Sequence, residues 1–299
     1  MAECLRPWPR VRWTPGYRSR DVIDRRGARP GGKGAGGLLL LLPILLRSPL
    51  GWLVLAALVV GYLFFGRGTG PVEEAPRGAT AEHAGGGTVD PQAAFVGFVL
   101  DDVQSTWSKL FAEAGVPYAR AKLVLFTDAT PTACGYGTSA TGPFYCPTDQ
   151  RVYLDLGFFR ELAQRMGARG DFAQAYVIAH EIGHHVQNLL GTTERMKVPR
   201  ALREGPAGAS VRLELQADCL AGVWARGTQE RDLLEAGDLE EAMTAASAVG
   251  DDRMQRRATG TVSPDAFTHG TSAQRSRWFR RGLEGGSVKA CDTFAAPEL

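Results

Sequence analysis

The stretch from Asp171 to Leu190, DFAQAYVIAHEIGHHVQNLL, contains the pattern His-Glu-x-x-His at positions 180 to 184. Residues four apart lie on the same face of a helix, so His180 and His184 can present two imidazoles to one metal ion. Glu181 lies one position further along and can reach a water molecule bound to that metal. A pattern this short also arises by chance, so its meaning depends on the rest of the sequence.

A second stretch, Ser210–Trp224 (SVRLELQADCLAGVW), has apolar residues at helical spacing and predicts a second helix. Glu214 and Asp218 are four apart and share a face of it. Catalytic zinc usually has three protein ligands and one open position, so a carboxylate here would complete a His, His, Glu set. The other carboxylate would accept the N–H of a ligand imidazole. Solvated helix charges are the alternative, but the apolar neighbours make this a poor solvent face.

Several segments together resemble the bacterial membrane-anchored family called putative neutral zinc metallopeptidases: AHEIGHHVQ, ELQADCLAGVW, FTHGTSAQRSRWF and the N-terminal RSRDVIDRRG. The order HExxH then ExxxD is also similar to the gluzincin branch of zinc metallopeptidases. The resemblance implies an α+β, zincin-like domain, mostly helical with a small antiparallel sheet. It implies one zinc ion per chain, a catalytic Glu181, Asp218 behind a ligand, and zinc ligands at His180, His184 and Glu214.

The segment around His269 resembles the Thr-His-Pro…Arg element that follows ExxxD in some membrane gluzincins. His269 could donate to the oxyanion of a tetrahedral intermediate, and Arg275 could pair with Glu214 or Asp218. The alternative is that His269 is a loop histidine and Arg275 a surface charge. His185 is rotated by about 100° from its ligand neighbour, so we expect it to hydrogen-bond behind the ligands or in the core.

The N-terminal part of the chain differs from the rest in composition. Residues 1–36 are basic and lack a core pattern, which predicts a disordered cytoplasmic tail. Residues 37–66 are apolar apart from Arg47 and Ser48, and they predict a membrane span at about 48–66. The basic tail places the N-terminus in the cytoplasm and the remainder outside. A longer tilted span with Arg47 snorkelling and a cleaved signal peptide are the alternatives.

Residues 67–90 are rich in glycine, proline and charge and predict a flexible linker, followed by a metallopeptidase-like domain at 91–299. In that domain, hydrophobic periodicity predicts helices, a strand and a hairpin. The helices are expected at 93–114, 156–166, 232–246 and 271–282, the strand at 122–126, the hairpin at 132–156, and a polar loop at 254–263. Gluzincins carry a strand beside the zinc that pairs with an extended substrate, and we expect Cys134–Thr138 to be that edge.

Of the five cysteines, Cys4 lies in the tail and four follow the apolar segment. Cys134 and Cys146 bracket the expected hairpin, which suits a local disulfide and would leave Cys219 with Cys291. Four cysteines allow three pairings, and four free buried thiols are a further alternative.

These features predict a zinc metalloendopeptidase in a bacterial cell membrane, single-pass, with the N-terminus cytoplasmic and the domain outside. Its expected partners are a peptide or protein substrate and the membrane lipid. The net charge of +2, concentrated at the N-terminus, argues against a nucleic-acid surface. One alternative is a zinc-stabilised binding or assembly protein without turnover, and another is a structural surface protein without metal. Glu181 favours the enzyme, because a structural metal site does not need that carboxylate.

Overall fold

A mixed four-stranded sheet forms one part of the structure. Its strand order is β1 (Val22–Asp24), β2 (Lys122–Phe126), β6 (Arg151–Asp155) and β5 (Phe144–Cys146). Strands β1 and β6 run parallel to β2, and β5 runs antiparallel to β6. Strand β2 has the sequence KLVLF, and its last four residues are buried, as expected for a central strand covered on both faces. The small antiparallel sheet that was expected is therefore a mixed sheet, with two parallel pairs and one antiparallel pair.

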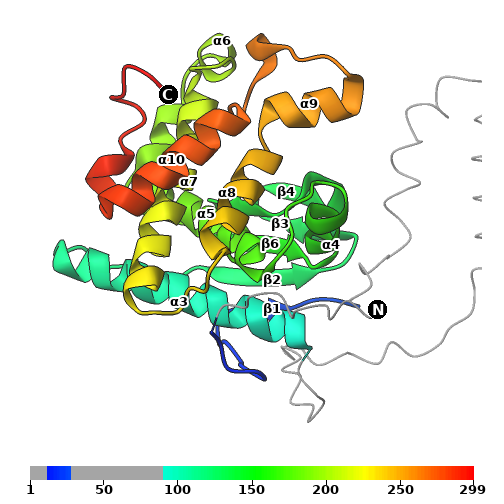
Figure 1. Ribbon diagram of the computed structural model, residues 1–299, viewed down its shortest axis with the longest axis vertical. Coiled ribbons are helices and arrows are strands. Elements are labelled where there is room, and N and C mark those ends of the chain that lie inside the picture. The colour runs from blue at the N-terminus through cyan, green and yellow to red at the C-terminus, as the bar shows by residue number, and fades with distance from the viewer. Residues whose placement is uncertain (1–11, 28–89) are drawn as a thin grey trace, which may run out of the picture. The chain divides into compact units, whose positions relative to one another are not determined.

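Helices make up most of the remaining structure, so the expected α+β class is confirmed (Figure 1). Helix α5 contacts α3, α7, α8 and the strands β5 and β6, which places it at the centre of the fold. The helices are α3 (Pro91–Glu113), α4 (Gly157–Gln164), α5 (Asp171–Leu189), α6 (Arg200–Arg203), α7 (Ala209–Glu230), α8 (Asp238–Ala248), α9 (Asp251–Thr259) and α10 (Ser272–Gly285). Strands β3 (Ala129–Thr132) and β4 (Gly135–Thr138) form a separate antiparallel pair.

Glycines allow the helices around α7 to approach one another closely. A Cβ atom at Gly183 of α5 would lie 2.9 Å from the carbonyl oxygen of Ala217 on α7. A Cβ atom at Gly222 of α7 would lie 2.0 Å from the carbonyl oxygen of Phe279 on α10. Such contacts leave no room for a methyl group, so glycine sets the spacing of α5 and α10 against α7.

This computed structural model describes residues 12–27 and 90–299, which belong to one unit of the chain. The apolar segment expected at 37–66, the linker up to residue 89 and Cys4 lie outside the described residues. In the two described ranges, no helix has both the length and the apolar character needed to cross a membrane.

Residues 12–27 are ordered against the domain, contrary to the expectation of a disordered tail from 1 to 36. Strand β1 pairs with β2 from Val22↔Leu123 to Asp24↔Leu125. Trp13 packs on Phe95 of α3 with ring centroids 5.6 Å apart. A three-residue strand is too short for a periodicity signal, and the many arginines around it hide the few apolar residues.

Helix α9 occupies residues that were expected to form a polar loop at 254–263. Its first turn carries Asp251 and Asp252 and its last turn Arg256 and Arg257, so each end of the helix dipole has charges of the opposite sign. Gly260, with φ of 77°, terminates it. This helix is polar almost throughout, so it lacks the apolar stripe on which a sequence-based assignment depends.

Two disulfides are present among the described residues. One joins Cys134 to Cys146, and the other joins Cys219 of α7 to Cys291, 72 residues further along the chain. The structure thus has one of the three pairings that the sequence left open. The second disulfide attaches the C-terminal segment to the helix that carries Glu214.

Candidate metal centre

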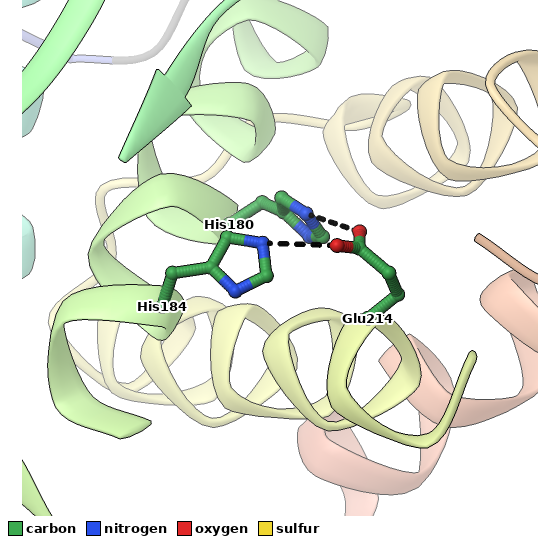
Figure 2. A group of neighbouring side chains, drawn as sticks. All are labelled: His180, His184 and Glu214. Atoms are coloured by element: carbon green, nitrogen blue, oxygen red, sulfur yellow. Dashed lines mark ion pairs between the residues drawn. The ribbon is translucent and has the colours of Figure 1, made fainter. Parts of the chain in front are cut away.

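Helices α5 and α7 bring together His180, His184 and Glu214, as Figure 2 shows. Nε2 of His180 lies 3.2 Å from Oε2 of Glu214, and Nε2 of His184 lies 3.4 Å from Oε1. A tetrahedral zinc ion with bonds of about 2.0–2.1 Å has its ligand atoms about 3.3 Å apart. The two nitrogen–oxygen distances therefore fit the edges of such a site, and two imidazoles with one carboxylate are a donor set that zinc accepts.

Hydrogen bonds to the other ring nitrogens orient both imidazoles. Nδ1 of His180 lies 2.9 Å from Oδ1 of Asp218, and Nδ1 of His184 lies 2.9 Å from Oε1 of Gln187. Both neighbours are acceptors, so each Nδ1 carries a proton and each Nε2 faces Glu214, where it would offer its lone pair to a bound metal. Lone pairs that face a carboxylate repel it unless a positive charge lies between them. A metal ion supplies that charge, as it does where ligand histidines donate Nδ1–H to a carboxylate.

Electrostatics at this site favour a cation. Burial lowers the pKa of His180, but the carboxylates of Asp218 and Glu214 outweigh this effect and raise it to about 10. Burial raises the pKa of Glu214, but His184 and His180 hold it well below its usual range. The carboxylates therefore stay ionised and stabilise positive charge between the rings.

Asp218 lies behind His180 in a buried polar network. Its side chain is fully buried and accepts a hydrogen bond from the hydroxyl of Tyr176. It also accepts two from Arg275, at 2.8 Å from Nε and 2.9 Å from a terminal nitrogen. Arg275 is only 3% exposed, so the alternative of a surface charge is wrong for this residue. The bidentate pair fixes the carboxylate that orients His180.

Glu181 is buried and borders the same cavity as the three candidate ligands. Burial raises the pKa of its carboxyl, and the nearby His184 and His180 partly counteract the increase. A carboxylate with a raised pKa is a stronger base than an exposed one. It also plays no part in holding the three donor atoms together, so it is available for proton transfer.

His269 borders this cavity as well, and Asp251 holds it there. Oδ2 of Asp251 accepts backbone N–H groups from Thr268, His269 and Gly270 at 2.8, 2.6 and 3.0 Å. Oδ1 of Asp251 lies 3.2 Å from Nδ1 of His269. This hydrogen bond raises the pKa of His269 despite partial burial. The ring therefore carries positive charge readily and presents it at the cavity wall.

The cavity has a volume of about 600 Å³. Apart from the residues described above, much of its wall is apolar and comes from β5, α4, α5, α7, α9 and the turns that follow α4 and α8. These apolar side chains are Phe144, Tyr145, Phe158, Met166, Val177, Leu213, Val249 and Met254.

The expected edge strand at Cys134–Thr138 does not border the cavity. The segment that follows it, from Ser139 to Tyr145, does. Strand β5 is the terminal strand of the four-stranded sheet, and Phe144 and Tyr145 belong to it. The expectation for Cys134–Thr138 is therefore wrong, because β4 belongs to the separate two-stranded sheet and none of these residues lines the cavity.

His185 makes the core hydrogen bonds that its position on the helix predicted. It is fully buried, with Nε2 2.6 Å from the carbonyl oxygen of Ala119 and Nδ1 3.0 Å from the hydroxyl of Tyr145. It therefore supports the cavity wall from behind and does not face the candidate metal position.

Three residues of the site were not identified from the sequence: Tyr176, Gln187 and Asp251. Tyr176 lies four residues before His180 and Gln187 three residues after His184, so helical spacing could have identified both. Asp251 lies 18 residues before His269, and no periodic pattern links the two.

The fold and the site define an α+β protein with a candidate mononuclear metal centre carried by two helices. A sequence model described as putative neutral zinc metallopeptidase matches residues 11–294, and the chain belongs to that family.

Two bacterial relatives illustrate the range of similarity. The uncharacterised protein YpfJ of Escherichia coli K12 is 42% identical over 301 residues, covering 95% of this chain and 99% of YpfJ. The uncharacterised protein Rv2575 of Mycobacterium tuberculosis H37Rv is 43% identical over 210 residues, covering 67% of this chain and 69% of the relative. No solved structure gives a significant match.

Proposed function

We propose that this protein is a zinc-dependent endopeptidase with a zincin-like catalytic domain. The observation that carries the proposal is the presence of Glu181 in the same cavity as three candidate ligands. Structural zinc sites are closed by four protein ligands, whereas catalytic sites have three and an open position. Here three donors border a cavity large enough for a peptide segment, and a buried base lies beside them.

Zinc at this position would supply Lewis-acid activation of water and of the peptide carbonyl. Glu181 takes a proton from the attacking water and later delivers one to the leaving amine. His269, held by Asp251, places positive charge where the carbonyl oxygen becomes negative. Asp218 and Gln187 keep His180 and His184 in the tautomer that leaves each Nε2 available as a ligand.

An extended peptide is the proposed substrate. Strand β5 has a partner on only one side among the described strands, so its other edge offers backbone hydrogen-bonding groups beside the cavity. Strand addition of this kind gives affinity through the backbone and tolerates many sequences. The apolar wall would receive side chains of the peptide.

We propose a location in the bacterial envelope, with residues 37–66 contacting lipid and residues 90–299 outside the cytoplasm. The two disulfides support the second point, because such bonds persist in oxidising compartments. We propose no nucleic-acid partner.

The test is hydrolysis of a quenched fluorescent peptide library by the purified, zinc-loaded full chain. Wild type should cleave peptides, and Glu181→Gln should lose turnover by about 10²- to 10⁴-fold while binding zinc equally. Exposed Glu240 provides a matched control, and Glu240→Gln should behave as wild type.

Wild-type turnover in Glu181→Gln would remove Glu181 from the mechanism. If neither protein cleaves any peptide while each binds one zinc ion, the non-catalytic binding protein becomes the better interpretation.

A further inference from the structure

The N-terminal segment 12–27 forms part of the folded unit through backbone pairing. The amide of Leu123 donates to the carbonyl oxygen of Asp21 at 2.8 Å, and the amide of Arg25 donates to that of Leu125 at 2.8 Å. These bonds flank β1, so the central strand β2 has β1 on one side and β6 on the other. Residues 12–27 therefore complete the sheet.

Asp21 anchors this segment through its largely buried carboxylate, which pairs with two partly exposed cations. Its side chain is only 10% exposed and lies 2.5 Å from Nε of Arg120 and 2.7 Å from Nζ of Lys122. Gln104, fully buried on α3, donates a hydrogen bond to the same carboxylate at 3.3 Å. Its side-chain oxygen accepts one from the backbone N–H of Ala121 at 2.7 Å. A carboxylate with three donors, from α3, from β2 and from the loop before β2, is a specific docking contact.

Further contacts extend along the whole segment. Tyr17 donates its hydroxyl to Asp101 at 2.9 Å, and Ser19 lies against Gly97, where a Cβ atom would be 3.2 Å from the serine Cβ. The amide of Arg12 donates to the carbonyl oxygen of Leu233 at 3.2 Å. At the other end, Arg26 forms an ion pair with Asp90. The segment is thus attached to α3, β2 and the turn after α7.

We propose that residues 12–27 and residues 90–299 lie on the same side of the membrane, so the apolar stretch between them does not act as a single span. Hydrogen bonds require their atoms to be within about 3.2 Å, whereas the hydrocarbon core of a bilayer is about 30 Å thick. Strand β1 cannot pair with β2 across it. The chain positions that flank the intervening segment, at Arg26 and Asp90, are in direct contact.

This topology differs from the one that the basic tail predicts. Positive charge near a membrane segment favours the cytoplasm, and that rule would place residues 12–27 opposite the domain. Here two cations of the basic segment pair with the domain, Arg26 with Asp90 and Arg12 with Asp232. Part of the positive charge therefore serves to dock the segment. The inference does not depend on peptidase activity.

The test is cysteine labelling of the full chain, in a Cys4→Ser background, with a membrane-impermeant maleimide. Thr14→Cys reports on the N-terminal segment and Lys109→Cys on α3, because both positions are exposed. Spheroplasts and inverted vesicles are labelled in parallel. We expect both reporters to react in the same preparation, and reaction of one in each preparation would overturn the proposal.

A second measurement detects the pairing itself in intact membranes. Ile23 lies opposite Val124, so Ile23→Cys with Val124→Cys places two Cα atoms about 4.8 Å apart, within disulfide range. Tyr153 lies opposite Val124 on the far side of β2, so Ile23→Cys with Tyr153→Cys is the matched control beyond that range. A membrane-permeant oxidant should cross-link only the first pair. Equal failure of both pairs would count against the docked segment.

Discussion

Gln187 controls the orientation of a candidate ligand through its side-chain amide. Its nitrogen donates to the carbonyl oxygen of Leu213 at 2.7 Å and to Gln216 at 3.1 Å, so its oxygen must face His184. Both amide contacts lie on α7, which carries Glu214. One side chain therefore couples the orientation of His184 to the helix that supplies the third ligand.

Replacing Gln187 should weaken metal binding without removing a ligand. We expect Gln187→Leu to reduce zinc affinity by about 10- to 100-fold, because Nδ1 of His184 loses its acceptor. His184→Ala should lose stoichiometric zinc altogether. Competition with a chromophoric chelator measures both affinities, and wild-type affinity in Gln187→Leu would show that this hydrogen bond does not matter.

Asp251 should set the pH at which His269 loses its charge. The carboxylate raises the pKa of His269, so Asp251→Asn should lower that pKa. If cationic His269 stabilises the oxyanion, the alkaline limb of kcat/KM should move to lower pH in the variant.

The same pair has a stability consequence. A His269 pKa raised by folding stabilises the protein fully at pH values below the unfolded pKa, and the contribution disappears as pH rises through the folded pKa.

Asp265→Asn, at an exposed position near His269 in the sequence, is the control for Asp251→Asn and should leave the pH profile of kcat/KM unchanged. An unshifted alkaline limb in Asp251→Asn would contradict the role of His269.

At the scale of helices and strands, hydrophobic periodicity identified the elements that carry an apolar stripe. Helices α5 and α7 were expected from their spacing, as was the strand at 122–126, and the three candidate ligands named from the sequence lie together. Strand β1 and helix α9 were missed, because three residues carry no period and a polar helix carries no stripe. Asp251 is the first residue of α9, so missing that element also hid the partner of His269.

The contact between α5 and α7 depends on Gly183. We expect Gly183→Ala to cost about 1–3 kcal/mol in the free energy of unfolding, because its methyl group would meet the backbone of Ala217. The two helices carry all three candidate ligands, so zinc affinity should fall as well. Chemical denaturation and chelator competition measure the two effects.

Gly227 offers a matched comparison on α7. A Cβ atom there meets only Thr106, at an ordinary 3.5 Å. Gly227→Ala should therefore stabilise the helix by up to about 1 kcal/mol. Equal effects of the two substitutions would mean that helix propensity, and not the approach of α5 to α7, governs Gly183.

At the scale of the molecule, the disulfide between Cys219 and Cys291 closes a loop of 72 residues. Constraining the unfolded chain over this length should contribute about 4 kcal/mol. We expect the double variant Cys219→Ser, Cys291→Ser to lose that amount of free energy of unfolding, measured by chemical denaturation, and reduced wild type, which lacks both disulfides, to lose somewhat more. The disulfide between Cys134 and Cys146 closes a loop of only 12 residues, so its removal should cost less free energy of unfolding.

Strand β1 also has a practical consequence for producing the protein. A fragment that begins at Asp90 would be an obvious choice for producing the domain that carries the candidate metal centre. Such a fragment would leave one edge of β2 without a neighbouring strand, and Arg120 and Lys122 would lose their ion-pair partner Asp21. A bare, apolar strand edge is a template for pairing between chains. Aggregation of a trimmed fragment would therefore reflect the missing sixteen described residues, and a fusion that joins residues 12–27 to 90–299 by a short linker is the better design.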